Sequence, residues 1–309
     1  MSGPGKYKDH SKAATDLKLG SIDSFDATFK TKAANGTAIE ASQSVKHGST
    51  SAVTKLSLKF KKCAGLRLES FEASTDGSMK TAVGISDVAP GVSLSAGTER
   101  KYDGKAKSHK DCAYVSGTYS TDAIVFNGKA CALNRSLDLD ALFGYQNFLV
   151  GAQAGFSQAK PFTGASGVLA FNWADANRVS FEANNKKEFN FATYMKPFGG
   201  VEVGVYGKGS IVEAPAAASK EGEAATKESE ASSALKLDAT LASKFALDNN
   251  GTSLTTSVNV NPLDIQSKCH VGLSYTQKLR NYASVTISGE VGVTDTAHVG
   301  LGAELEMGN

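Results

Sequence analysis

The sequence predicts an all-β chain whose strands close into a barrel. First, apolar and polar residues alternate through most of the 309 residues, and a two-residue period is that of a β-strand. Second, the chain has 31 glycines but only 6 prolines, which favours strands over helices. Third, the last alternating segment ends at Met307, and a terminal strand invites aggregation unless both of its edges are paired. A closed barrel pairs both edges.

Composition and hydropathy narrow the class of protein. The hydrophobic fraction is 41%, the mean hydropathy is −0.21, and no apolar run approaches the roughly 18 residues that a membrane helix requires. These values exclude a helical membrane protein. They are compatible with a membrane barrel, because half of the residues in its strands face water. We expect residues 1–309 to form a single barrel domain.

The first twenty residues contain no apolar segment of the kind that directs Sec export. Asp9 and Asp16 also argue against a cleaved mitochondrial presequence, so a barrel with this N-terminus is expected in an organelle. The net charge of +2, from 33 basic and 31 acidic side chains, argues against a nucleic-acid partner.

The cysteines and histidines form no recognisable chemical site. Cys63, Cys112, Cys131 and Cys269 lie in separate segments without metal-type spacing, and we expect free thiols in preference to a disulfide or a redox role. The five histidines are scattered, and no nucleophile elbow or phosphate loop is present. We therefore predict no enzyme activity, no catalytic residue, no cofactor and no bound metal.

Residues 7–19 are the one good helix candidate before the strands begin. At helical spacing, Tyr7, His10, Ala14 and Leu17 fall on one face, and charged residues surround it. This face is too small for stable membrane insertion, yet large enough to prefer a partly apolar wall to bulk water. We expect residues 1–20 to be a helical segment in the barrel lumen. The alternative is a frayed polar tail.

Alternating segments then follow one another along the chain. Residues 24–32 form the first, and Asn35-Gly36 predicts a hairpin turn after it. Residues 52–61, 148–156 and 235–247 are further examples. The glycines of residues 199–209 alternate with valines and lack the helix of a dinucleotide fingerprint, so strand packing is the better interpretation.

Residues 213–233 break the alternation. They are rich in Ala, Ser and Glu and contain no aromatic side chain to bury. We expect a solvated low-complexity loop, inserted between two barrel strands and outside the membrane.

The closing segments carry a characteristic ending. Residues 284–293 and 298–307 alternate aliphatic side chains with Gly, Ser, Thr and Glu. The second segment has a polar residue, a glycine and two hydrophobic residues at the spacing of a barrel-insertion signal: His298, Gly300, Ala303 and Leu305. This ending resembles the last strands of the mitochondrial porins, the voltage-dependent anion channels of the outer mitochondrial membrane.

The resemblance covers nearly the whole chain apart from the low-complexity loop. Residues 7–20 resemble the family's N-terminal segment, which lies inside the pore, and residues 29–36, 147–160 and 271–279 are the best further stretches. We count about nineteen alternating segments, which is also the strand number of the family, so the count is not independent of the resemblance. With an odd number of meandering strands, the first and the last must pair in parallel.

The resemblance implies a voltage-gated, weakly anion-selective channel through which metabolites and ions diffuse across the mitochondrial outer membrane. Its permeants would be nucleotides, phosphate and small anions, and its macromolecular partners the lipid bilayer and other barrels of the same kind. Two alternatives remain open. One is the related protein-translocating barrel of the same membrane, and the other is a soluble β-rich binding protein.

The basic residues of the early strands are the best candidates for setting selectivity. Lumen-facing lysines could raise the local concentration of anions, although ordinary solvation explains them equally well. Lysines of the N-terminal segment would also lie near the permeation path. The predicted pore-lining set is Lys8, Lys12, Lys18, Lys30, Lys32, Lys55, Lys59 and Lys61.

Two features of the family are absent. Gly91-Val92-Ser93 stands where the family has a nucleotide-associated Gly-Leu-Lys. Ser70 stands where the family has a membrane-facing glutamate, on which gating and hexokinase docking depend. By strand alternation, Glu72 is the next side chain expected on the outward face.

Overall fold

The computed structural model describes residues 6–17, 19, 22–46, 52–60, 66–103, 108–158, 161–173, 177–213, 233–248, 251–264, 269–279, 283–293 and 299–308. It contains a 3-10 turn, η1 (Tyr7–Asp9), one turn of α-helix, α1 (Lys12–Thr15), and nineteen strands. Among the described residues, no helix is long and apolar enough to cross a membrane.

The strands follow one another in order along the chain. Their bounds are β1 Ser24–Lys32, β2 Ala38–Lys46, β3 Ala52–Lys59, β4 Leu66–Ser74, β5 Met79–Ala89, β6 Val92–Asp103, β7 Ser108–Ser120, β8 Ile124–Cys131, β9 Ser136–Tyr145, β10 Phe148–Ser157, β11 Gly164–Asn172, β12 Arg178–Asn184, β13 Glu188–Phe198, β14 Val201–Glu213, β15 Ser233–Ala246, β16 Ser253–Val260, β17 Cys269–Lys278, β18 Ala283–Gly292 and β19 Val299–Gly308.

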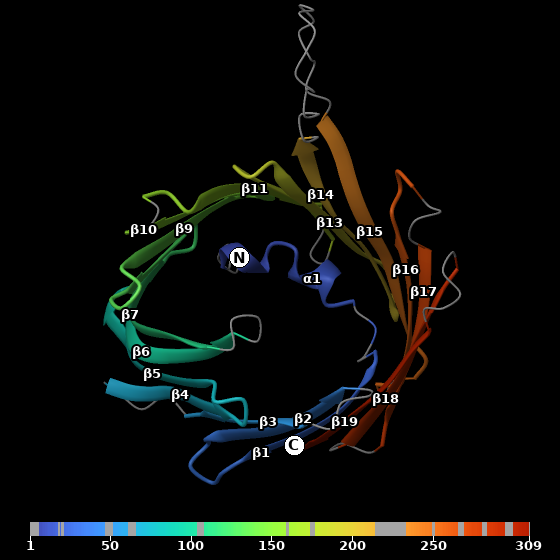
Figure 1. The fold of residues 1–309 in the computed structure, drawn as a ribbon, viewed down its shortest axis with the longest axis horizontal. Helices are drawn as coiled ribbons and strands as arrows, with labels where there is room; N and C mark the ends of the chain where they lie inside the picture. The colour runs from blue at the N-terminus through green and yellow to red at the C-terminus, as the bar shows by residue number, and fades with distance from the viewer. Residues whose placement is uncertain are drawn as a thin grey trace, which may run out of the picture.

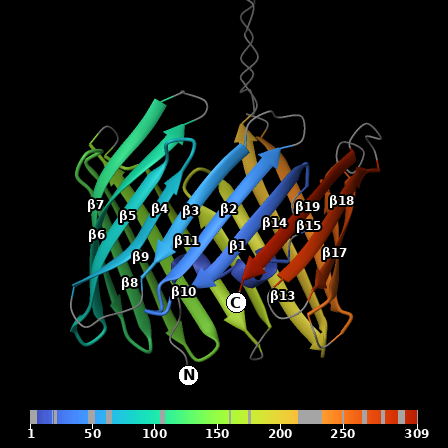
Figure 2. The same cartoon turned by 90° about the horizontal axis from the view of Figure 1, so that it is seen from below.

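All nineteen strands belong to one sheet that closes into a ring (Figure 1). Each strand pairs antiparallel with the next, whereas β1 and β19 pair in parallel, from Phe25 with Ala303 to Lys30 with Gly308. The side view shows the strands inclined across the wall (Figure 2). Parallel closure between the first and last strands is therefore confirmed, and it follows from an odd number of meandering strands.

Glycine permits the tight turns that connect the strands. Gly36 has a φ of 81° and donates its N–H to the carbonyl of Ala33, which places the predicted Asn35-Gly36 turn between β1 and β2. Gly91 has a φ of 75° in the turn between β5 and β6. A Cβ there would also overlap the carbonyl oxygen of Ser120, so the turn requires the glycine that this chain shares with the family's Gly-Leu-Lys, and the departure from that pattern begins at Val92.

The predicted low-complexity loop lies outside the described residues apart from its two ends. Glu213 closes β14 and Ser233 opens β15, and the register pairs them directly. The alternation predicted to resume at residue 235 is that of β15.

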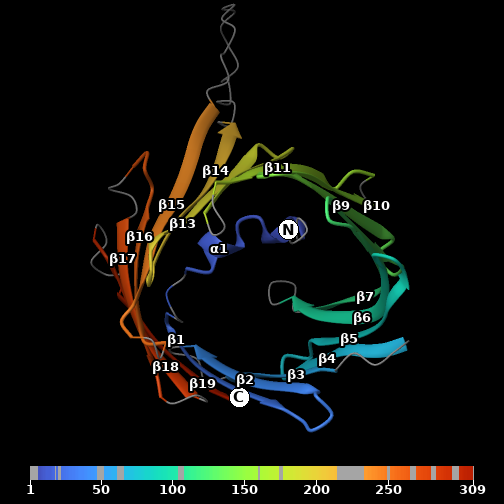
Figure 3. The ribbon, with the colours of Figure 1, turned by 180° about the vertical axis from the view of Figure 1, so that it is seen from behind.

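The N-terminal segment lies within the ring and is visible from both ends of the barrel (Figures 1 and 3). Its helical part is shorter than predicted, because residues 7–19 form only η1 and α1. A helix of so few residues is unstable by itself, so contacts with the wall hold the segment in place. The predicted apolar face is confirmed: Tyr7, His10, Ala14 and Leu17 are each at least nine-tenths buried.

The sheet has a lumen face and an outer face, and the register carries each face around the ring. On β18, for example, Ser288 and Glu290 are buried on the lumen face, whereas Ile287 and Val291 are exposed on the outer face. The same alternation places Phe25, Leu301 and Leu273 on the outer face. Large exposed apolar side chains on a continuous outer face are typical of a barrel surrounded by lipid.

Candidate functional site: the lumen and the N-terminal segment

Tyr7 anchors the start of the N-terminal segment to β9–β12. Its ring is 2% exposed and packs in a cluster with Leu142, Leu149, Val168 and Ala170. The phenol oxygen lies 2.8 Å from Oγ of Ser166 and donates to Oε1 of Glu182 at 3.2 Å. Burial, the main cause, raises the pKa of Tyr7 to about 12. The phenol is therefore neutral at physiological pH and able to donate.

His10 and Asp9, in the same segment, make further polar contacts with β12, the strand that carries Glu182. Nδ1 of His10 donates to the carbonyl oxygen of Tyr7 at 2.7 Å, and Nε2 of His10 lies 3.6 Å from Oε2 of Glu182. Asn190 donates to the same carboxylate oxygen at 3.2 Å. The guanidinium of Arg178, on β12 like Glu182, also donates to the carbonyl oxygen of Asp9. Polar contacts thus fix both ends of η1 to the wall.

Apolar packing holds the next part of the segment against β13–β15. Ala14 and Leu17 form a buried cluster with Ala192, Tyr194 and Ala242, and Tyr206 packs beside it. Gly204 on β14 allows this close approach. A Cβ at that position would lie 2.9 Å from Cδ1 of Leu17 and 3.2 Å from the carbonyl oxygen of Ala14.

Two more lumen-facing glycines follow the segment towards β1. A Cβ on Gly272 of β17 would overlap Cδ1 of Leu19, and a Cβ on Gly300 of β19 would overlap Cγ2 of Ile22. Glycine is found where another part of the chain approaches a strand closely. We call the wall positions Gly204, Gly272 and Gly300 the glycine track, because they follow the segment across three strands.

The segment does not fill all the space beside the wall. A cavity of about 220 Å³ remains between Leu17, Leu19 and the lumen faces of β14–β18. Tyr206, Asn259 and Glu290 are among its lining residues. Nδ1 of His270 lies 2.8 Å from Oε1 of Glu290 at this side of the barrel.

Lysine–carboxylate pairs dominate the wall that the segment does not touch. Lys55 on β3 lies 2.8 Å from Glu72 on β4. Glu99 on β6 contacts both Lys101, at 2.7 Å, and Lys129 of β8, at 3.3 Å. The lysine side chains remain partly exposed, and pairs of opposite sign moderate the positive field expected from the lysines alone.

The structure places the predicted pore-lining lysines as follows. Lys30, Lys32, Lys55 and Lys59 lie on the lumen face of β1 and β3, and Lys30 is paired with Glu306. Lys12 is exposed on α1, inside the ring. Lys18, Lys61 and the side chain of Lys8 lie outside the described residues, so their predicted roles stay predictions.

The insertion-signal residues are divided between the two faces of β19. Gly300 faces the lumen, where it belongs to the glycine track, and Ala303 and Leu305 face outwards opposite Ile287 and Val285. His298 lies outside the described residues. The sequence pattern did not indicate the packing role of Gly300, because its neighbour Ile22 comes from the other end of the chain.

The prediction that Glu72 lies on the outer face is wrong. Glu72 is opposite Ser57 on the lumen face and forms the ion pair with Lys55. The cause is an irregularity in the β4–β5 register between Leu68 and Ser70. A β-bulge reverses the alternation of the side chains that follow it, so parity counted forward from Leu68 gave the wrong face.

The prediction of free thiols is also wrong for one pair of cysteines. Cys112 on β7 and Cys131 on β8 form a disulfide with a Cα–Cα distance of 5.8 Å. The two strands are neighbours in the sheet, which brings together cysteines 19 residues apart. Cys269 is free, and Cys63 lies outside the described residues.

Comparison with known families agrees with the ring and its internal segment. The sequence profile of the eukaryotic porins matches residues 3–300, a range that runs from the N-terminal segment into β19. The chain belongs to the eukaryotic porin family. A porin of this kind is a membrane-embedded barrel whose pore passes small solutes, and its family is one of channels and not of enzymes. No curated protein matched the sequence.

Membership of the porin family argues against one of the interpretations that the sequence left open. The mitochondrial porins that the sequence resembles belong to the eukaryotic porins, and the apolar outer face suits a transmembrane barrel. A soluble β-rich binding protein agrees with neither observation.

Proposed function

We propose that this porin is a voltage-gated, weakly anion-selective diffusion channel of the mitochondrial outer membrane. Its permeants are metabolites and ions, namely nucleotides, phosphate and small anions. The observation that carries the proposal is the charged N-terminal segment that packs on the lumen wall inside the ring of strands. Such a segment narrows the path and carries charge that can respond to a voltage.

The gating part of the proposal rests on the charge of residues 6–19. Four lysines against two aspartates give this segment a net charge of +2 when His10 is neutral. Moving one elementary charge through the whole membrane field changes the free energy by about 2.3 kcal/mol per 100 mV. A displacement of the segment across part of the field therefore competes with the hydrogen bonds and packing that seat it.

The selectivity part rests on the lysines of the uncovered wall. Their carboxylate partners leave only a modest positive field, so we expect a weak preference for anions that salt reduces. Permeation requires no binding site of fixed stoichiometry and no chemical reaction.

Single-channel recording of the purified full-length chain in a planar bilayer tests this function. We expect a large ohmic conductance near zero voltage, lower-conductance states at higher voltage of either sign, and a reversal potential in a salt gradient that favours chloride. A steady conductance that ignores voltage contradicts gating, and a cation preference at all salt concentrations contradicts the selectivity. Purification of the endogenous protein with small receptor subunits would support a protein-translocating barrel instead.

Cell fractionation tests the location separately. We expect the protein in the outer membrane of mitochondria, resistant to carbonate extraction. Its recovery in another organelle would contradict the mitochondrial assignment without affecting the channel activity.

A further inference from the structure

We propose that Cys112 and Cys131 are a reversible thiol-modification site on the lumen wall, reduced by small thiols that enter the pore. Both cysteines lie on the lumen face, since Cys112 is opposite Glu99 and Cys131 is opposite Tyr114. Cys131 is buried and Cys112 is partly exposed, so a reagent reaches the bond from the lumen on the Cys112 side. The effect on current rests on the proposed channel function, whereas the chemistry does not.

The disulfide lies at the point where β8 stops but β7 continues. The β7–β8 register ends with Tyr114 opposite Cys131, and the N–H of Ala132 then donates to the carbonyl oxygen of Ala113 at 2.8 Å. Beyond this point, the described part of β7 pairs with β6 alone, as far as Ser108. The disulfide therefore connects the end of β8 to a part of β7 that has no backbone pairing with β8.

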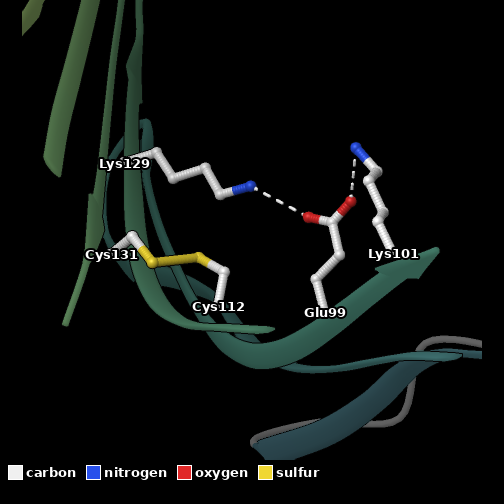
Figure 4. The surroundings of a disulfide bond; sticks show 5 residues. All are labelled: Glu99, Lys101, Cys112, Lys129 and Cys131. Atoms are coloured by element: carbon white, nitrogen blue, oxygen red, sulfur yellow. Dashed lines mark hydrogen bonds and ion pairs between the residues drawn. A yellow bond between two sulfur atoms is a disulfide. The ribbon is translucent and has the colours of Figure 1, made fainter. Parts of the chain in front are cut away.

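A charged cluster of the lumen wall lies beside the bond (Figure 4). Lys129 precedes Cys131 by one lumen-facing position on β8, and its Nζ lies 4.4 Å from the centre of the Tyr114 ring and 3.3 Å from Oε2 of Glu99. Lys101 contacts the other carboxylate oxygen of Glu99 at 2.7 Å. Holding Cys131 in place thus also limits the movement of Lys129 relative to Glu99.

The reaction is a two-electron thiol–disulfide exchange. A thiolate of a small dithiol attacks Sγ of Cys112, the Sγ–Sγ bond breaks, and Cys131 leaves as a thiolate that takes up a proton. The second thiol of the reagent then attacks the mixed disulfide, which releases Cys112 and leaves the reagent as a cyclic disulfide. Oxidised glutathione reverses the process, with release of two glutathione thiols. Cytosolic thiol pools favour the reduced form.

Reduction leaves the end of β8 attached by backbone pairing and the Lys129–Glu99 contact. Since a partly exposed ion pair contributes little by itself, the strand end and Lys129 should fluctuate more. A mobile lysine at the wall changes the charge that permeating ions meet, so we expect a step in single-channel conductance on reduction.

Reversible formation of the Cys112–Cys131 disulfide is tested on the full-length protein carrying Cys63→Ser and Cys269→Ser. These substitutions leave only the two cysteines of the bond. After oxidised glutathione, we expect a cross-linked peptide and almost no alkylation by N-ethylmaleimide. After dithiothreitol, we expect loss of the cross-link and alkylation of Cys112 ahead of Cys131. Full alkylation of both residues after the oxidant would show that the bond does not form and would overturn the proposal.

The effect of the disulfide on conductance is tested by adding dithiothreitol to single channels of the same protein. We expect a conductance step that oxidised glutathione reverses, and no step in the matched variant with Cys112→Ser, which keeps the buried Cys131. Reduction confirmed by mass but without a step overturns the effect on current. Absence of any channel in either redox state contradicts the proposed function and leaves the cross-linking result standing.

Discussion

The wall that carries the N-terminal segment differs in composition from the wall that faces it. On the covered wall, which we define as the lumen faces of β9–β19, the packing contacts are made by small or apolar residues such as Gly204, Ala192 and Leu142. On the open wall, the lumen faces of β2–β8, pairs such as Lys55–Glu72 and Lys129–Glu99 prevail. Both walls obey the same strand alternation.

The difference shows that the polar face of a barrel serves two purposes. Where the chain packs on itself, a long charged side chain would be desolvated at a cost, so glycine and alanine are favoured. Glu182 and Arg178 are exceptions, and both are hydrogen-bonded: Tyr7, His10 and Asn190 surround the carboxylate of Glu182, and Arg178 donates to the carbonyl oxygen of Asp9. Where the wall meets water, charge costs little and can influence the ions that pass.

Removing the segment should abolish the difference between the covered and the open wall, and we expect this to be the largest effect. Deletion of residues 1–20 exposes the covered wall to water, removes the net positive charge of the segment and widens the path. Conductance should rise or become unstable, and voltage dependence should be blunted, as measured in planar bilayers. Unchanged conductance and gating in the truncated barrel would contradict a seated segment.

Filling the glycine track should unseat the segment while keeping all of its residues. In Gly272→Val the new side chain would overlap Leu19 and press on Oγ of Ser257. Overpacking of this kind costs about 1–3 kcal/mol, and trypsin should then reach Lys12 faster than in the unmodified barrel. Gly167→Val is the matched control, because a Cβ there faces outwards and its nearest contact is the carbonyl oxygen of Gly151 at 3.8 Å. Equal cleavage rates in the two variants would count against the track.

Loss of the Tyr7 hydroxyl should weaken the attachment of the N-terminal segment to the wall by a smaller amount. Tyr7→Phe keeps the buried ring but removes the hydrogen bonds to Ser166 and Glu182. This should reduce the free energy that holds the N-terminal segment on the wall by about 1 kcal/mol. The voltage needed to half-close the channel should fall. Tyr145→Phe, at an exposed ring, is the control and should leave that voltage unchanged.

The Tyr7 phenol should also make the attachment of the N-terminal segment weaker at high pH. Its pKa is raised from 10.0 to about 12, so its contribution is complete below pH 10.0 and is lost as the pH rises through about 12. Voltage dependence in the unmodified channel should weaken over that range. Tyr7→Phe should not show this part of the loss.

Changing single charges on the open wall should have the smallest effect, confined to ion selectivity. Lys55→Gln leaves Glu72 without its lysine and should move the reversal potential towards cations, whereas Glu72→Gln should move it towards anions. Neutralising Lys55, Lys59 and Lys61 together should give the larger shift in the first direction. Shifts of the same sign in the two single variants would show that the pair does not act on permeating ions.

The sequence was most informative where one local pattern decides the structure. Alternation placed the strands, Asn35-Gly36 placed a turn, and helical spacing identified the buried face of the N-terminal segment although only two short helical pieces form. The family resemblance supplied the strand count, and the parallel closure followed from it.

Features that depend on distant or irregular pairing could not be predicted in this way. One irregularity after Leu68 reversed the predicted direction of Glu72, and no local pattern announces such a bulge. The Cys112–Cys131 bond needed the exact strand register, and the glycine track needed the position of a segment that folds back from the other end of the chain.

The parallel seam between β1 and β19 also determines when the barrel can be completed. It joins residues 278 positions apart, from 25 to 303, and contacts this distant in sequence form slowly because a long loop must close first. During synthesis, β1 presents an unpaired edge until the last ten residues of the strand ladder emerge. A chain without those residues would have two open strand edges, at β1 and at β18, and open edges are not tolerated in lipid.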